Sequence, residues 1–414
     1  MSVQTIKSSR RRVLILNRWA PWQLCTGERI RNHWLLHALA THYRIDLRLA
    51  QALPEIPSEY TQMLQSIESF PSPSGLAGLL QSCGDVLIRR RPVHAAGVVS
   101  PALRAEVARL LSEHEYAAIQ ADLSMADAIP AETSVPIVYT AHNCETVLQR
   151  RLAYGERFPL AAVMRWDARR LARFEQRFVR RAALVAACSF EDIAAFDQLS
   201  RTTPISTVLV PNGVSLSKYA GLTTQTTAPP TVLISGNMES RANQQGLLWF
   251  LHDVLPLLRA RKRDVVVRIA GRIHASFSDM ISHYEGVLLV PNPPDMRPEL
   301  ERAQLVLVPV TASSGARIRI LEAWAAGRPV VTTTAGVHGI EHEEGHDLIV
   351  RDDPLEFVDA ICGLLNTPGY CDLLRRHGLE RVAQYDWSLA GKKLVEAYWS
   401  ITEAPDALVA PSAR

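Results

Sequence analysis

The feature that most constrains the fold of this chain is the alternation of short β-branched runs with longer helical patterns along its 414 residues. Strands that alternate with helices pair in parallel, because each helix returns the chain to the same edge of the sheet. Residues 53–80, rich in Pro, Ser and Gly, interrupt the pattern and are expected to form an irregular surface excursion. The predicted strands are 13–17, 44–50, 86–90, 118–121, 137–140, 184–188, 232–235, 265–270, 287–290, 305–310 and 330–333.

The pattern predicts an α/β protein with two doubly wound parallel sheets, and the chain is long enough for two cores. Residues 212–230 contain few large apolar side chains and end in Pro-Pro, which is typical of a linker. We therefore expect an N-terminal domain over 1–211, a C-terminal domain over 231–386, a last helix over 387–402 and a tail over 403–414. Other predicted helices are 31–40, 160–181, 244–261 and 316–326.

Composition argues against several classes of protein. A net charge of +3 is too small for a nucleic-acid-binding surface, so no nucleic-acid partner is expected. No apolar run approaches the roughly 18 residues that a membrane span needs, and the basic start MSVQTIKSSRRR lacks the apolar core of a signal peptide. The six cysteines show no C-x-x-C spacing, which favours free thiols in a reducing compartment. These observations predict a cytoplasmic protein.

The most informative segment is 305–334, LVLVPVTASSGARIRILEAWAAGRPVVTTT, which places a small-residue loop between a buried strand and a helix. Such a junction presents free backbone N–H groups and the positive end of a helix dipole, which together suit a diphosphate. Gly315 lets the backbone approach closely. Arg319 and Glu322 share a helix face, where a guanidinium can bind phosphate oxygens and a carboxylate can accept ribose hydroxyls. The alternative is an ordinary surface pair of charges.

This segment resembles the G-T-R-L-K-I-L-E-A-M-A-x-G-x-P-V-V signature of the family-4 retaining glycosyltransferases with the GT-B fold. The similarity extends from about Val13 to Trp399. It implies two Rossmann-like domains facing across a cleft, a nucleotide-diphosphate sugar as donor, and no required metal or other cofactor. Further similar segments are SGNMESRANQQGLLWFLHDVLPLLR, VPNPPDMRPELERAQLVLVPV, VPNGVSLSKY, YDWSLAGKKLVEAYW and, more weakly, TGERIRNHWLLHALA.

The resemblance also implies roles for individual residues of the C-terminal half. Gly315 and Ala316 would face the donor diphosphate. Arg319, at the family's lysine position, would neutralise the leaving nucleoside diphosphate, and Glu322 would hold the ribose. The planar arginine guanidinium binds phosphate oxygens through several donors, whereas the lysine ammonium is a compact point charge, so the exchange changes how the phosphates are bound.

Two further positions concern the base and the sugar. Residues 290–295, with Asp295 at their end, match the family's loop near the nucleobase. Many relatives carry Glu-x7-Glu, whose first Glu contacts the transferred hexose, and Ser314 takes that position here. A subset of the family with the G-T-R-L-K form also lacks this Glu. Recognition of the sugar is therefore the property that this departure puts in question.

The N-terminal half offers fewer candidates. The loop NRWAPWQLCTGERIR places Gly27 before a helix, and by resemblance Gly27, Arg29 and Arg31 contact the donor phosphates or the acceptor. The alternative is that both arginines are solvated. His142 follows a predicted strand, at the sheet edge where such folds bind ligands, and matches a family residue that contacts the donor sugar. A structural histidine is the alternative.

The predicted helix 160–181 is basic and amphipathic. Such a helix is compatible with peripheral contact at the inner membrane face or with a lipid-diphosphate acceptor. The alternative is a helix that packs on its sheet and leaves its basic face in water. Its apolar stripe consists of Leu160, Val163, Met164, Leu171, Phe174 and Phe178.

These observations predict a glycosyltransferase that moves a hexose-type sugar from a nucleotide-diphosphate donor to a glycan or lipid-linked acceptor, with retention, in polysaccharide biosynthesis. Arg319 and His142 are the predicted catalytic residues. One alternative is a non-catalytic nucleotide-sugar-binding protein, which Ser314 leaves open. A second is an NAD-dependent oxidoreductase, which would need a G-x-G-x-x-G fingerprint after 13–17 or 232–235, and neither position has one.

Overall fold

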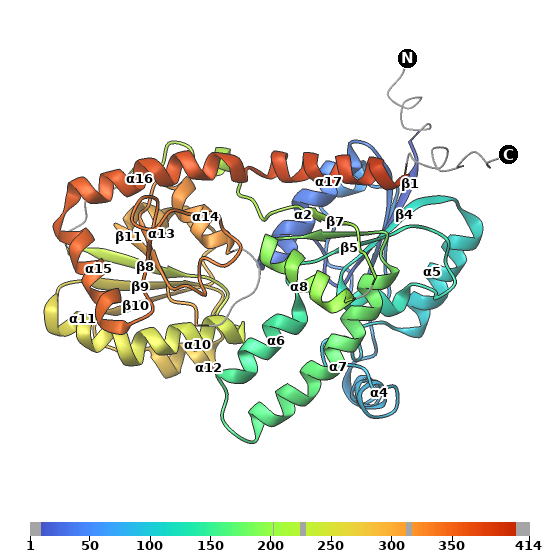
Figure 1. Ribbon diagram of the computed structural model, residues 1–414, viewed down its shortest axis with the longest axis horizontal. Helices are drawn as coiled ribbons and strands as arrows, with labels where there is room; N and C mark the ends of the chain where they lie inside the picture. Colours follow the sequence, from blue (N-terminus) through green and yellow to red (C-terminus); the bar gives the residue numbers. More distant parts are fainter. Residues whose placement is uncertain (1–9, 202, 224–228, 312–316, 403–414) are drawn as a thin grey trace, which may run out of the picture. The chain divides into compact units, whose positions relative to one another are not determined.

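The computed structural model describes residues 10–201, 203–223, 229–311 and 317–402. It divides into two compact units, and each is a parallel sheet with helices on its faces (Figure 1). Unit 1 consists of the chain up to Val210 together with the residues from Ala390 onward, and unit 2 runs from Pro211 to Leu389. The prediction of an α/β protein with two doubly wound parallel sheets is confirmed.

The sheet of unit 1 has seven parallel strands in the order β3-β2-β1-β4-β5-β6-β7. The strand order reverses between β1 and β4, and folds of this kind bind ligands at the carboxyl ends of the strands beside such a switch point. Its strands are β1 (Arg12–Asn17), β2 (Arg44–Leu49), β3 (Ser66–Ser69), β4 (Tyr116–Ala121), β5 (Ile137–Thr140), β6 (Leu184–Ala187) and β7 (Thr207–Leu209).

Helices cover this sheet, and the last helix of the chain contributes to its core. The side chain of Tyr398 in that helix is fully buried, and its hydroxyl donates a hydrogen bond to Gln120 Oε1 of β4 (2.7 Å). The helices are α2 (Gly27–Ala40), α3 (Ser58–Met63), α4 (Gly75–Leu87), α5 (Pro101–Glu113), the 3-10 helix η1 (Leu123–Ala128), α6 (Glu145–Tyr154), α7 (Leu160–Arg181), α8 (Phe190–Ser200) and α17 (Trp387–Thr402).

The sheet of unit 2 has six parallel strands in the order β10-β9-β8-β11-β12-β13, so its switch point lies between β8 and β11. Its strands are β8 (Thr231–Ser235), β9 (Val266–Gly271), β10 (Val287–Pro291), β11 (Leu305–Val308), β12 (Val330–Thr332) and β13 (Ile349–Val350). Its helical segments are α9 (Leu216–Tyr219), α10 (Arg241–Trp249), η2 (Phe250–Val254), α11 (Leu255–Arg261), α12 (Ala275–Ile281), α13 (Arg297–Arg302), α14 (Ile318–Ala325), α15 (Pro354–Asn366), α16 (Pro368–Val382) and η3 (Ala383–Tyr385).

One predicted strand is wrong. Residues 86–90 complete helix α4 and the turn after it. Asp85 is buried there, and its carboxylate accepts hydrogen bonds from Gly97 N (2.9 Å), Arg89 Nη1 (3.0 Å) and Arg91 Nη1 (3.2 Å). These bonds fix a helical turn where the run of β-branched residues predicts a strand.

Two segments expected to be irregular carry regular structure. Strand β3 lies within residues 53–80, and its sequence SIES has too little apolar alternation to be recognised as an edge strand. Residues 212–230 contain α9, in which Tyr219 is buried in the core of unit 2. The predicted stripe of α7 is buried only in part, because Leu160 and Val163 are exposed. All six cysteines are free, as predicted, although Cys25 and Cys83 are exposed.

Candidate functional site

The candidate site of unit 2 lies at its switch point. Strand β8 ends there and is followed by Gly236, and α14 is the next helix in the chain after β11. Helix α14 begins at Ile318, two residues later than predicted. Ser314, Gly315 and Ala316 lie outside the described residues, so their predicted contacts with a diphosphate remain predictions.

Arg319 is fixed against the end of β8. Its Nη1 donates to the Ser235 carbonyl oxygen (2.8 Å) and its Nη2 to Asn243 Oδ1 of α10 (2.5 Å). Gly236, with a φ of 144°, lies directly against the guanidinium, and a Cβ there would come within 2.8 Å of it. Burial lowers the pKa of Arg319 to about 10, and Glu322 opposes the effect. The side chain therefore remains a positioned cation at neutral pH.

Glu322, one turn further along α14, is held by Tyr219. The Tyr219 hydroxyl donates to Glu322 Oε1 (2.8 Å). Burial raises the pKa of Glu322, while the Tyr219 hydrogen bond and the charges of Lys218 and Arg319 oppose the rise. Burial and the nearby carboxylate raise the pKa of Tyr219, which keeps its proton available for this bond. The bond engages Oε1, so Oε2 can accept hydrogen bonds from a ligand.

Asp295 belongs to the same electrostatic neighbourhood. Its carboxylate accepts hydrogen bonds from the Arg297 backbone N–H (3.0 Å) and from Arg297 Nε (2.6 Å). Burial alone would raise the pKa of Asp295, but these bonds and the charges of Arg297 and Lys218 lower it overall. Lys218 thus lowers the pKa of both Asp295 and Glu322. The charge of one lysine therefore acts on both predicted residues.

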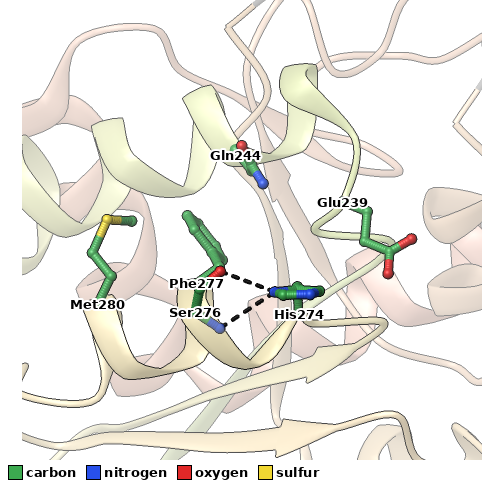
Figure 2. A pocket seen from close by; sticks show the side chains of 6 residues that line it. All are labelled: Glu239, Gln244, His274, Ser276, Phe277 and Met280. Carbon is green, nitrogen blue, oxygen red and sulfur yellow. Dashed lines mark hydrogen bonds between the residues drawn. The ribbon is translucent and has the colours of Figure 1, made fainter. Parts of the chain in front are cut away.

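An open pocket of about 410 Å³ lies on the side of this edge formed by α10 and α12 (Figure 2). His274 begins the α12 side, where its Nδ1 faces Ser276 Oγ (2.9 Å). Gln244 adjoins in sequence the Asn243 that holds Arg319. The pocket is lined by Glu239, Gln244, His274, Ser276, Phe277 and Met280.

In unit 1 the predicted residues follow β1 and β5. Gly27 begins α2, which Thr26 caps by accepting a hydrogen bond from Arg29 N (3.4 Å). Arg29 contacts its own loop, with Nη1 donating to Gln23 Oε1 (2.7 Å) and the guanidinium over the Trp19 ring (4.9 Å). Arg31 is only 1% exposed, so the alternative that it is solvated is wrong.

His142 lies in a polar group at the switch point of unit 1. One ligand-type atom from each of His142, Glu28 and Asp122 lies within 4.8 Å of the others. Among the described residues, neither ring nitrogen of His142 nor Asp122 Oδ2 has a hydrogen-bond partner, and all three atoms are buried. Burial lowers the pKa of His142 to about 3, and the charges of Arg31 and His94 act in the same direction. His142 is therefore neutral at neutral pH.

Glu28 is the acid of this group whose pKa is raised. Burial raises the pKa of Glu28 to about 8, helped by the charge of Asp122 and opposed by that of Arg18. Asp122 Oδ1 accepts hydrogen bonds from Ser124 N (2.8 Å) and Met125 N (3.2 Å), which cap η1. The group thus presents two carboxyl groups and a neutral imidazole, which together can bind hydroxyl groups.

Sequence reasoning missed four residues of these sites. Asp122 could have been found because it directly follows β4, much as His142 follows β5, and Glu28 because it adjoins the predicted Gly27 at the start of α2. The contact between Tyr219 and Glu322 joins residues 103 apart, and that between Asn243 and Arg319 joins residues 76 apart. No local spacing signals either pair.

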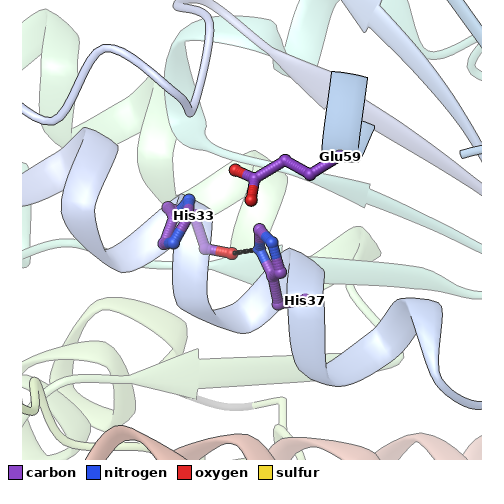
Figure 3. A group of neighbouring side chains, drawn as sticks. All are labelled: His33, His37 and Glu59. Carbon is purple, nitrogen blue, oxygen red and sulfur yellow. Dashed lines mark hydrogen bonds between the residues drawn. The ribbon is translucent and has the colours of Figure 1, made fainter. Parts of the chain in front are cut away.

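A second group with metal-ligand chemistry lies on the side of α2. His33, His37 and Glu59 each offer one ligand atom within 4.8 Å of the others, and Figure 3 shows the Glu59 carboxylate beside both rings. His37 Nδ1 donates to the His33 carbonyl oxygen (2.8 Å), and His33 Nδ1 contacts Tyr60 Oη (2.5 Å). Histidine nitrogens and a carboxylate oxygen are ligands that a divalent ion such as zinc accepts. This group does not include any of the predicted site residues.

Comparison with known families and proteins covers both units. Residues 71–218 match the family described as Glycosyltransferase Family 4, and residues 229–367 match Glycosyl transferases group 1. The two segments together exceed half of the chain.

Two curated relatives match shorter stretches. An uncharacterised 44.6 kDa protein in the cps region of Klebsiella pneumoniae is 28% identical over 138 residues, which are 31% of this chain and 36% of that protein. A D-inositol 3-phosphate glycosyltransferase of Corynebacterium urealyticum is 30% identical over 120 residues, 28% of each chain. The chain therefore spans about a third of the curated relatives it matches.

Solved structures are similar over nearly the whole chain. Sucrose-phosphate synthase from Thermosynechococcus elongatus has a TM-score of 0.71 and 16% identity over 95% of this chain and 100% of that one. Anabaena HepE in complex with UDP-glucose has a TM-score of 0.65 and 17% identity, and the match covers 94% of this chain and 100% of that one. These likenesses establish the fold. Within the described residues, no helix has the length and apolar content of a membrane span.

Proposed function

This chain belongs to the family-4, group 1 glycosyltransferases and has their GT-B fold, and from that premise we propose that it transfers a hexose-type sugar from a nucleotide-diphosphate donor to a glycan or lipid-linked acceptor, with retention. The observation that carries the proposal is the paired fixation of Arg319 and Glu322 at the switch point of unit 2. A held cation and a held carboxylate one turn apart match the phosphates and the ribose of a nucleotide.

Arg319 supplies the electrostatic part of the proposed mechanism. Negative charge develops on the leaving diphosphate as the bond to the sugar breaks, and a preorganised cation stabilises that charge more than it stabilises the ground state. The bonds to Ser235 and Asn243 hold the guanidinium before the substrate arrives. In unit 1, we assign the hydroxyl-binding group of His142, Glu28 and Asp122 to the sugar and the acceptor.

We infer the class of donor and the biological setting from two relatives. HepE was solved with UDP-glucose, so UDP-hexoses are the first donors to test. The relative encoded in a cps region supports a role in polysaccharide assembly. We expect no metal requirement, because the Arg319 cation can neutralise the leaving group.

A ligand panel and one variant test the proposal. We expect one of UDP-, GDP- or ADP-glucose to raise the melting temperature, because a ligand that binds the native state stabilises it. Glu322→Ala should then weaken binding of the same nucleotide by roughly 1–3 kcal/mol, through loss of the ribose hydrogen bonds. Glu356→Ala, in α15, is the matched control. Unchanged affinity in calorimetry would remove Glu322 from the site, and binding without transfer or hydrolysis would support a non-catalytic nucleotide-sugar-binding protein.

A further inference from the structure

Helix α4 of unit 1 directs an apolar face into solvent. Leu76, Leu79, Leu80 and Leu87 are 60–74% exposed, and their spacing places them along one side of the helix. Asp85 is the one buried residue of the thirteen in this helix. An amphipathic helix in a water-soluble unit normally buries such a face, and a contiguous exposed apolar face of this kind marks a binding surface.

A second group of exposed apolar side chains lies on α6 and α7. It occupies the last turn of α6, the connection to α7 and the first two turns of α7. Its first members include aromatic rings, which are favoured where a protein meets the polar boundary of a bilayer. The group consists of Tyr154, Phe158, Leu160, Val163 and Trp166.

Contacts join the two groups into one surface. Arg170 of α7 packs its guanidinium over the Trp166 ring (4.3 Å) and donates to the Val86 carbonyl oxygen in the last turn of α4. Val93 N, in the segment after α4, donates to Asp167 Oδ1 of α7 (3.0 Å). Figure 1 shows α4 next to α7. We call the combination of the α4 leucines and the α6–α7 group the apolar face of unit 1.

Positive charge surrounds this face. The acids of these segments offset part of this charge, because buried Asp85 pairs with Arg89 and half-buried Glu156 lies between α6 and α7, but the arginines outnumber them. Arginine places its charge in the lipid headgroup region while its stem covers apolar surface. The exposed arginines of α6, α7, their connection and the residues just after α4 are Arg89, Arg90, Arg150, Arg151, Arg157, Arg165, Arg169, Arg173, Arg177, Arg180 and Arg181.

We propose that the apolar face of unit 1 binds the surface of an anionic phospholipid bilayer, with α4 lying at the interface and the arginines contacting lipid phosphates. The exposed leucines and aromatic rings supply apolar contact, and the arginines select negatively charged lipid. A protein partner would need acidic groups at matching positions, whereas a bilayer meets this mixture without them. The proposal concerns unit 1 alone and does not rest on the proposed transfer reaction.

Flotation with lipid vesicles tests the apolar contribution. We expect the full-length protein to float with vesicles of 30% phosphatidylglycerol in phosphatidylcholine and to remain unbound with pure phosphatidylcholine. The double variant Leu79→Ser/Leu80→Ser should bind at least about tenfold more weakly, because less apolar surface enters the interface. Leu355→Ser/Leu379→Ser removes two exposed leucines of unit 2 and should bind as the wild type does.

Charge variants test the electrostatic contribution. Arg165→Gln/Arg169→Gln should weaken binding by roughly fivefold for each arginine, and added salt should weaken the wild type further. Arg263→Gln/Lys392→Gln removes the same charge elsewhere and should have little effect. Absence of wild-type flotation, or equal losses in test and control variants, would overturn the proposal. So would a dimer that dissociates in Leu79→Ser/Leu80→Ser while no variant binds vesicles, since the face would then be a contact between two copies.

Discussion

At the scale of single residues, the hydroxyl of Tyr219 determines how Glu322 is presented to a ligand. Tyr219→Phe keeps the buried ring and removes the donor, so we expect the fold to change little and the pKa of Glu322 to rise further. Affinity for the nucleotide identified by the panel should fall by roughly 0.5–1.5 kcal/mol. The loss should be larger at pH 6 than at pH 8, because a protonated carboxyl no longer accepts two ribose hydrogen bonds.

Calorimetry of wild type and variant at both pH values measures this effect. The control is the same substitution in a Glu322→Gln background, where the carboxylate is already absent and Tyr219→Phe should have no additional pH-dependent effect. If Tyr219→Phe weakens nucleotide binding equally at both pH values in the protein that retains Glu322, Tyr219 acts only through packing.

The raised pKa of Glu28 predicts how the stability of unit 1 depends on pH. Its pKa is about 8 in the folded state against 4.5 for an ordinary glutamate, so the folded state holds the proton more tightly. The resulting stabilisation is complete below pH 4.5 and is lost as the pH rises toward 8. Relative to Glu28→Gln, the free energy of unfolding of the wild type should fall by up to about 1.4 kcal/mol for each pH unit between pH 4.5 and pH 8. Parallel melting-temperature profiles from pH 5 to pH 9 would contradict this expectation.

At the scale of elements, one side-chain network joins β8, α10 and α14. Asn243→Ala removes the acceptor of Arg319 Nη2, so the guanidinium loses one of its two fixed contacts. We expect turnover to fall roughly tenfold and nucleotide affinity to fall less, because a misplaced cation loses mainly transition-state stabilisation. The melting temperature is measured in parallel, since Asn243 Nδ2 also donates to the Asn237 carbonyl oxygen.

A double-mutant cycle makes this prediction specific. In an Arg319→Ala background, Asn243→Ala should cause no further loss of turnover. Gln245→Ala, in the same helix α10 but outside the residues that line the pocket, serves as the control. Additive losses in the double variant would mean that Asn243 acts independently of Arg319.

Elements differ in how far the sequence predicts them, and burial is the reason. Strands β8 and β11 are continuous apolar runs buried on both faces, so their composition identifies them. Strand β3 lies at a sheet edge and pairs only with β2, so its sequence SIES does not need the apolar residues that identify a buried strand. Helix α14 could be predicted together with Arg319 and Glu322, but their partners come from α9, β8 and α10, which only the folded chain brings together.

At the scale of the whole molecule, each unit is expected to contribute a separable part of the activity. His142 belongs to unit 1, whereas Arg319 and Glu322 belong to unit 2. His142→Ala should leave nucleotide affinity nearly unchanged and reduce transfer by roughly a hundredfold, because the lost contacts would involve mainly the reacting sugar. Calorimetry with the nucleotide and a transfer assay measure the two effects. An equal loss of nucleotide affinity, or transfer at the wild-type rate, would exclude His142 from the sugar site.

Helix α17 has a consequence for the order in which the protein can fold during translation. Unit 1 consists of the first part of the chain and of residues beyond Leu389, and all of unit 2 lies between them. On the ribosome, the sheet of unit 1 is synthesised first but must wait for α17 to supply Tyr398, which is fully buried against β4. Unit 2 has all its residues earlier. The first unit to be synthesised is therefore the last to be completed, and in the meantime Gln120 lacks its tyrosine partner.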